Sequence, residues 1–80
     1  LEQVALKVMP NPSAGSMVFT SKEENPMQQV EIYNLAGQMI KSHVVNASQF
    51  QLDRTYLNTG MYIAKVKFTD GILAKKIIFE

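Results

Sequence analysis

The chain contains no cysteine, no tryptophan and a single histidine. The absence of cysteine excludes disulfide bonds and thiolate metal sites, and it fits an exported protein without bridges as well as a cytosolic one. Apolar residues make up 46% of the sequence. No apolar run approaches the ~18 residues of a membrane-spanning helix, so we expect a folded domain with no membrane span.

An excess of charge of one sign is also missing. Eight basic and seven acidic residues are interspersed and give a formal net charge of +1. Domains that bind nucleic acid present a concentrated basic surface to the phosphate backbone. We therefore expect no nucleic-acid partner.

Residues that usually carry catalysis are scarce. His43 lies beside Ser42, with Asp53 further along, but no glycine-rich turn presents Ser42 as a nucleophile. The carboxylates lack the spacing of a calcium loop, and the four glycines stand singly rather than in a phosphate-binding loop. The sequence predicts no catalytic residue, no metal and no cofactor, so we expect a protein that is not an enzyme.

What the sequence does have is alternation of apolar and polar residues in short runs, which places them on opposite faces of extended strands. Turn residues separate the runs by about 8 to 12 residues, a spacing typical of β-sandwiches. Two prolines in residues 10–15 predict an irregular turn that crosses between layers or ladders. The pattern predicts seven strands, near residues 4–8, 17–20, 27–34, 38–45, 49–53, 60–68 and 72–80.

Seven short strands in one small chain need two layers, because a single open sheet leaves a hydrophobic face in water. We therefore expect a seven-stranded, immunoglobulin-like antiparallel β-sandwich. The best helical alternative, residues 35–45, contains Gly37 and ends in two valines, so a strand is favoured there. An all-strand unit of 80 residues without an export leader indicates a fragment of a longer protein.

The first of two predicted hairpins has a three-residue loop, residues 35–37, with Gly37 in the left-handed conformation. This loop length brings opposite charges and apolar residues together across the two strands. It predicts three cross-strand pairs: Tyr33 with Met39, Ile32 with Ile40, and Glu31 with Lys41.

The closing hairpin has two candidate loops. A type I′ turn at Asp70 and Gly71 sets Lys65 opposite Lys76. A three-residue loop with a bulge at Gly71 sets Lys65 opposite Lys75 instead. Both place like charges opposite each other, so charge does not choose between them and the loop type stays open.

The outer face of the closing hairpin mixes charged and apolar side chains. Alternation places six residues on it: Lys65, Lys67, Lys76, Met61, Ile63 and Ile78. A mixed surface of this kind is a candidate docking site for another protein. The simpler interpretation is that lysines on a solvent-facing strand keep sheets from adding to one another.

Four motifs, taken in order, resemble one known family. They are residues 10–15 (PNPSAG), 30–37 (VEIYNLAG), 60–66 (GMYIAKV) and 75–79 (KKIIF). Together they resemble the C-terminal sorting domain of type IX secretion cargo, and the resemblance covers residues 4–80.

This resemblance implies that residues 1–80 are a single sorting domain, an address on a protein exported through the periplasm of a gram-negative bacterium to the cell surface or beyond. The implied partners are the outer-membrane translocon, a cysteine transpeptidase that removes the domain, and an N-terminal cargo domain. The resemblance implies that the family's motif residues correspond here to Pro10, Asn11, Pro12, Gly15, Tyr33, Gly37, Gly60, Tyr62 and Lys76. We expect Lys65 and Lys67 to join Lys76 as contact residues.

Other functions remain open from the residues themselves. An immunoglobulin-like or fibronectin-like spacer needs no special site. A carbohydrate-binding module needs coplanar exposed aromatic side chains, for which only Tyr33 and Tyr56 are free candidates.

Overall fold

The computed structural model describes residues 6–54 and 57–80, so Tyr56 and the start of the run predicted at residues 4–8 lie outside the described residues. The described part contains strands and turns and no helix. The strands are β1 (Leu6–Met9), β2 (Met17–Ser21), β3 (Met27–Tyr33), β4 (Met39–Ala47), β5 (Gln49–Leu52), β6 (Gly60–Phe68) and β7 (Gly71–Phe79). The described residues therefore contain no helix that is long and apolar enough to cross a membrane.

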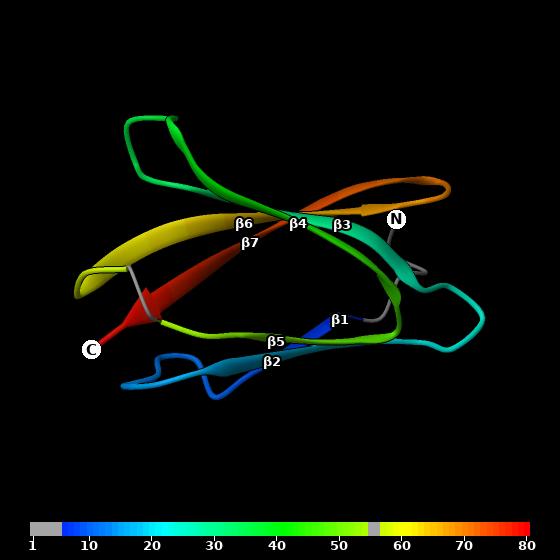
Figure 1. Cartoon of the computed structure of the whole chain (residues 1–80), viewed down its shortest axis with the longest axis horizontal. Coiled ribbons are helices and arrows are strands. Elements are labelled where there is room, and N and C mark those ends of the chain that lie inside the picture. Colours follow the sequence, from blue (N-terminus) through cyan, green and yellow to red (C-terminus); the bar gives the residue numbers. More distant parts are fainter. Residues whose placement is uncertain (1–5, 55–56) are drawn as a thin grey trace.

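Two antiparallel sheets are stacked face to face, with the strand orders β1-β2-β5 and β4-β3-β6-β7 (Figure 1). The predicted seven-stranded, immunoglobulin-like β-sandwich is confirmed. The chain changes sheets between β4 and β5, where the Ser21 N–H donates to the Ser48 carbonyl at 2.8 Å. Just before this crossing, Asn46 has φ 49°, a left-handed conformation that asparagine tolerates better than most residues.

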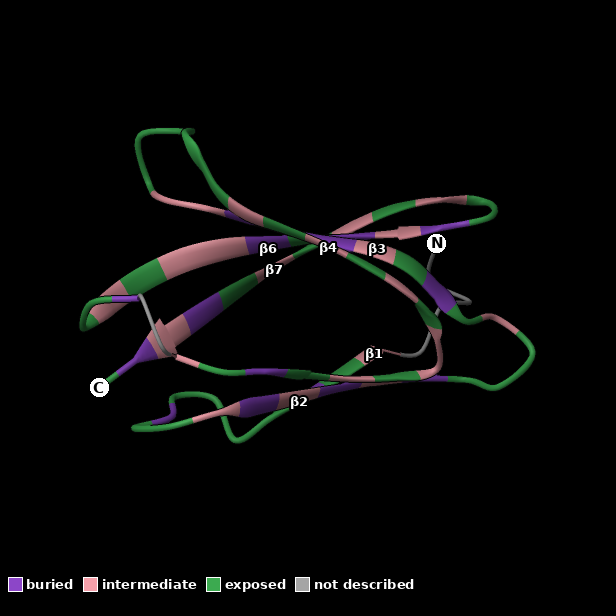
Figure 2. Ribbon diagram, viewed as in Figure 1, coloured by how far each residue is buried: buried purple, intermediate pink, exposed green. Residues whose placement is uncertain are grey.

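The core lies between the sheets, on the inward side of the alternating strands (Figure 2). Full burial of each large apolar side chain contributes roughly 1.5 to 3 kcal/mol. The side chains at 1% exposure or less are Met17, Phe19, Met27, Val30, Ile32, Leu52, Ala64, Val66, Ile77 and Phe79.

The β3–β4 hairpin has the predicted loop but not all of the predicted register. Gly37 has φ 88°, and Tyr33 lies opposite Met39 as predicted. A register shift follows immediately, so Ile32 faces Lys41 and Glu31 faces Ser42; the pairs predicted for these two residues are wrong. The extra residue of the bulge is accommodated at Ile40, which is 41% exposed instead of facing Ile32.

Neither predicted register of the closing hairpin is correct. A two-residue turn at positions 69–70 joins Phe68 to Gly71, and Lys65 lies opposite Ala74. Asp70 does not have the positive φ that a type I′ turn requires. The observed register differs from the type I′ register by two positions. Every side chain keeps its predicted face, and no two lysines lie directly opposite each other.

Candidate recognition surface

The turn of residues 10–15 joins β1 to β2 in one sheet and reaches β7 of the other sheet. The Asn11 side-chain amide donates to the Lys76 carbonyl at 3.0 Å, and the Ile78 N–H donates to Asn11 Oδ1 at 3.0 Å. An amide side chain presents the same donor and acceptor pair as a strand residue. Asn11 therefore caps the outer edge of β7 from outside its sheet.

Ser13 extends this contact with its backbone. Its N–H donates to the Ile78 carbonyl at 3.0 Å, and its carbonyl accepts from the Glu80 N–H at 2.8 Å, which makes a short parallel bridge beside Phe79. We call the contacts of Asn11 and Ser13 with β7 the clasp. The clasp holds the last strand against the opposite sheet.

The remaining residues of the turn support this geometry. The Ser13 hydroxyl donates to the Ser16 carbonyl at 2.9 Å and accepts from the Gly15 N–H at 3.0 Å, which closes the turn on itself. Pro10 and Pro12 flank Asn11, are exposed and have no N–H to donate. Of the motif positions here, Asn11 makes the clasp contact and Gly15 helps to close the turn that presents it.

Arg54 was not singled out in the sequence, because an isolated arginine between two strands carries no recognisable pattern. In the structure its guanidinium lies over the Phe79 ring, 5.8 Å from the centroid. It donates to four oxygens: the carbonyls of Ala14, Leu57 and Glu80 and the hydroxyl of Thr59. Arg54 therefore connects the turn before β2, the segment before β6 and the end of β7.

Tyr62 and Gly60 are also placed around the end of β7. The Tyr62 ring packs edge-on against Phe79 at 6.2 Å, and its hydroxyl donates to the Asn58 carbonyl at 2.9 Å. Gly60 pairs with Phe79 across the β6–β7 ladder and has φ 146°, a conformation rarely adopted by residues with a side chain. These two motif positions serve the packing of Phe79.

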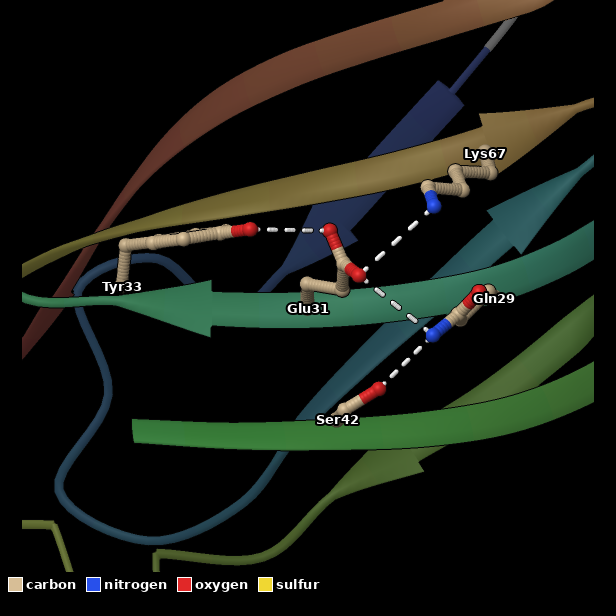
Figure 3. A network of polar contacts seen from close by, with 5 residues as sticks. All are labelled: Gln29, Glu31, Tyr33, Ser42 and Lys67. Atoms are coloured by element: carbon tan, nitrogen blue, oxygen red, sulfur yellow. Dashed lines mark hydrogen bonds and ion pairs between the residues drawn. The ribbon is translucent and has the colours of Figure 1, made fainter. Parts of the chain in front are cut away.

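A polar network occupies the outer face of the four-stranded sheet (Figure 3). At its centre is Glu31, which is only 8% exposed although it faces outward. Its carboxylate accepts from the Tyr33 hydroxyl at 3.0 Å and from Gln29 Nε2 at 3.4 Å, and it forms an ion pair with Lys67 at 3.7 Å. Gln29 also donates to Ser42 on β4 at 2.8 Å. A buried carboxylate needs such partners because its desolvation is costly, so the network fixes all of its members.

The predicted contact residues Lys65 and Lys67 meet at this network. The Lys65 ammonium lies 4.6 Å from the centre of the Tyr33 ring, a cation–π contact, while Lys67 is held by Glu31. Lys76 lies on the same face but one strand further out, opposite Ile63. The structure therefore brings two of the three lysines together and places the third beside them.

Apolar side chains surround these lysines. Ile63 and Ile78 are half-buried on the same outer face. The same face also carries four exposed apolar residues: Met39 (51% exposed), Val44 (78%), Met61 (44%) and Ile72 (49%). We call this surface of the four-stranded sheet the lysine face.

The Tyr33 hydroxyl donates to the Glu31 carboxylate, and this hydrogen bond, together with desolvation and the carboxylate's charge, raises the pKa of Tyr33 above 10.0. A raised folded-state pKa means that the contribution to stability is present below pH 10.0 and is lost as pH rises through the folded-state pKa. We expect Glu31→Gln to lower the pKa of Tyr33, as measured by NMR titration of the ring carbons. Lys22→Gln, on a distant loop, serves as the control; an unchanged midpoint in Glu31→Gln would contradict the network.

Ser42, His43 and Asp53 do not come together in the structure. Ser42 is on the outer face with Gln29, whereas His43 is on the inner side of β4, with its ring 5.0 Å from Phe50. Asp53 accepts a hydrogen bond from Gln51 at 3.1 Å. The three residues are held by separate structural contacts.

The fold and this surface define a class of protein: a small immunoglobulin-like β-sandwich with a clasped last strand and a mixed basic and apolar sheet face. The chain matches the family of secretion system C-terminal sorting domains over residues 7–80. It belongs to that family, the C-terminal sorting domains of type IX secretion, so the resemblance seen in the motifs is confirmed. No curated protein matches the chain.

Family membership fixes the general function. The chain is a C-terminal sorting signal of type IX secretion, and it is handled by that system as part of a parent cargo chain. Its destination is the cell surface or the outside of the cell.

Proposed function

We propose that residues 1–80 act as a single folded label that the outer-membrane translocon recognises after the cargo reaches the periplasm, and that a sorting transpeptidase then removes. The label has no catalytic role. The match over residues 7–80 is the observation that carries this proposal. A sandwich held together without disulfides can fold at the end of varied cargo.

Within the label, the lysine face is the surface that we assign to recognition. Glu31 holds Lys67 and the Tyr33 ring holds Lys65, so both side chains lose less freedom on binding than unrestrained lysines would. Apolar residues beside them supply the area that a protein partner can bury. The expected partner surface is acidic with an apolar centre.

The other motif residues contribute indirectly. Asn11, with Pro10, Pro12 and Gly15 around it, builds the clasp, while Gly37 closes the β3–β4 loop. In the same way, Gly60 and Tyr62 seat Phe79. We assign these positions to the shape of the label, and Tyr33 to the support of the lysines.

A carbohydrate-binding module has less support. Sugars stack on free aromatic faces. Lys65 lies over the Tyr33 ring, and Tyr56 is outside the described residues. If the domain were a passive spacer, no substitution on its surface would affect export. A sorting label differs, because substitutions on its recognition surface reduce export.

The lysine face is tested by fusing residues 1–80 to an exported reporter in a host with the type IX system. We expect the double variant Lys65→Gln and Lys76→Gln to reduce surface reporter at least about tenfold, the effect of losing about 1.4 kcal/mol of binding, with reporter retained in the periplasm. The matched control, Lys7→Gln and Lys22→Gln, changes charge equally and should export normally.

The same fusions test the wider proposal. Reporter recovered from the surface should have lost the 9.0 kDa of the label, as judged by mass spectrometry. Equal display of both double variants would refute the lysine face. Retention of the unaltered fusion in the periplasm would refute the sorting function, and surface reporter of full mass would refute removal.

A further inference from the structure

The edge of β7 differs from the other three sheet edges. Edge strands β1 and β5 have four residues each, and β4 carries a register shift and the left-handed Asn46. β7 has nine residues and pairs with β6 without a shift. A long regular edge is a template for another strand, because it presents a row of unpaired backbone groups.

The clasp shows which backbone groups of β7 face outward. It uses the carbonyls of Lys76 and Ile78 and the N–H groups of Ile78 and Glu80, all at even-numbered positions. In an antiparallel ladder, the N–H and carbonyl of one residue point to the same side. Ile72 and Ala74 therefore also point away from β6, and neither has an outward backbone partner within residues 6–54 and 57–80.

Asn11 ends this free stretch at Lys76, because it already bonds the Lys76 carbonyl. We call residues 72–76 the open edge. It is long enough for a segment of about five residues, and the clasp sets the limit at one end. Five residues is within the usual length of a strand.

The side chains of the open edge define the segment that fits it. A strand added there places its own side chains directly opposite those of β7. Positions 72–74 are apolar, and Lys75 and Lys76 follow on opposite faces with no ion pair within the described residues. A charge such as Lys75, which points inward from an edge strand, opposes strand addition in general. An acidic residue opposite it removes that opposition.

We propose that the open edge binds an extended segment of a partner protein by antiparallel strand addition, and that this segment carries two acidic residues followed by three β-branched apolar residues. The acidic residues lie opposite Lys76 and Lys75, and the apolar residues lie opposite positions 74 to 72. A second copy of the chain offers no acidic residue in its own open edge, so charge favours a different partner. This inference goes beyond the sorting role of the lysine face.

The probe for this proposal is the blocked peptide EEIVV, titrated into the chain of residues 1–80 and followed by NMR. Binding should shift the amide signals of Ile72 and Ala74. The charge-reversed peptide KKIVV should bind at least about tenfold more weakly, as expected for a loss of about 1.4 kcal/mol. N-methylation of the peptide isoleucine, whose N–H points at β7, should also weaken binding, whereas N-methylation of the next valine, whose N–H points away, should not.

Ala74→Pro tests the edge from the protein side. The Ala74 N–H points away from β6, so proline removes an outward donor without breaking the ladder. We expect Ala74→Pro to keep the wild-type circular dichroism spectrum and Tm but to lose peptide binding. Ala74→Val should keep both the fold and peptide binding. Lys22→Gln removes a positive charge from the loop after β2 and should leave peptide affinity unchanged.

Three outcomes would overturn the proposal. EEIVV and KKIVV could bind equally, which would show that charge does not select the segment. Folded Ala74→Pro could bind EEIVV like the wild type, which would place the peptide elsewhere. The chain could instead form a dimer that Ala74→Pro abolishes, which would make a second copy the occupant.

Discussion

Replacing Phe79 with alanine is expected to lower the free energy of unfolding by about 3 to 5 kcal/mol, the usual cost of removing a buried phenylalanine. Phe79 is fully buried, and the Tyr62 ring and the Arg54 guanidinium both pack against it. Domains of this size have a total stability of roughly 4 to 12 kcal/mol. This loss is a large part of that total, so Phe79→Ala should unfold at a clearly lower urea concentration than the wild type.

The matched control is Ile78→Ala, one position earlier on the same strand. Ile78 is half-buried on the outer face, so its removal leaves no closed cavity and should cost about 1 kcal/mol. If the two variants lose equal stability, Phe79 is not the centre of packing at this end of the sandwich. Export of the reporter should follow the folded fraction of the domain, so Phe79→Ala should be displayed less than the unaltered fusion.

Arg54→Met is expected to lower the free energy of unfolding by about 2 to 3 kcal/mol. Hydrogen bonds from a charged donor contribute about 1.5 to 3 kcal/mol each when buried, and water replaces part of that here because Arg54 is half-exposed. Methionine keeps the apolar stem over Phe79, so the loss reports on the four hydrogen bonds. Urea denaturation measures the total loss in the free energy of unfolding. Faster amide hydrogen exchange at Glu80 would show that the loss arises at the end of β7.

Two further variants sharpen this test. Arg54→Lys keeps the charge but should lose most of the same stability, because one ammonium cannot reach four separated oxygens. Lys22→Met removes a positive charge from the loop after β2 and should change stability by less than about 0.5 kcal/mol. Wild-type stability in Arg54→Lys would show that charge, not hydrogen-bond geometry, is what matters at this position.

Strand positions were predictable because their signals are local. Alternation marked the buried face of β3 through Val30 and Ile32, and the Gly37 loop followed from a single glycine. Proline, glycine and asparagine then fixed the turns between strands. These signals act over a few residues and need no knowledge of the rest of the fold.

Register was harder to predict. Moving β7 by two positions along β6 leaves every side chain on the same face, so alternation cannot distinguish the two registers. The bulge near Ile40 has the same origin, since one extra residue in β4 changes every later pair without changing the composition of the strand.

The clasp, the contacts of Arg54 and the burial of Glu31 depended most on contacts between residues that are far apart in the sequence. Asn11 bonds backbone groups 65 and 67 residues away, and Arg54 joins three segments that are separate in the sequence. From the sequence, Glu31 is expected to be an exposed acidic residue on the outer face, yet in the structure neighbouring side chains cover it. The family motif marked Asn11 without giving a reason, and the structure supplies it: the side chain substitutes for a missing strand.

The clasp also determines how the domain responds to force. The segment from Asn11 to Ser13 runs parallel to the end of β7, as the bridge between Ser13 and Phe79 shows. Tension that pulls the start of β1 and the end of β7 in opposite directions slides these two segments along each other and loads their four hydrogen bonds at once. Peeling a hairpin apart breaks its bonds one at a time, so the sandwich should yield to stretching at much higher loads than an unclasped sheet.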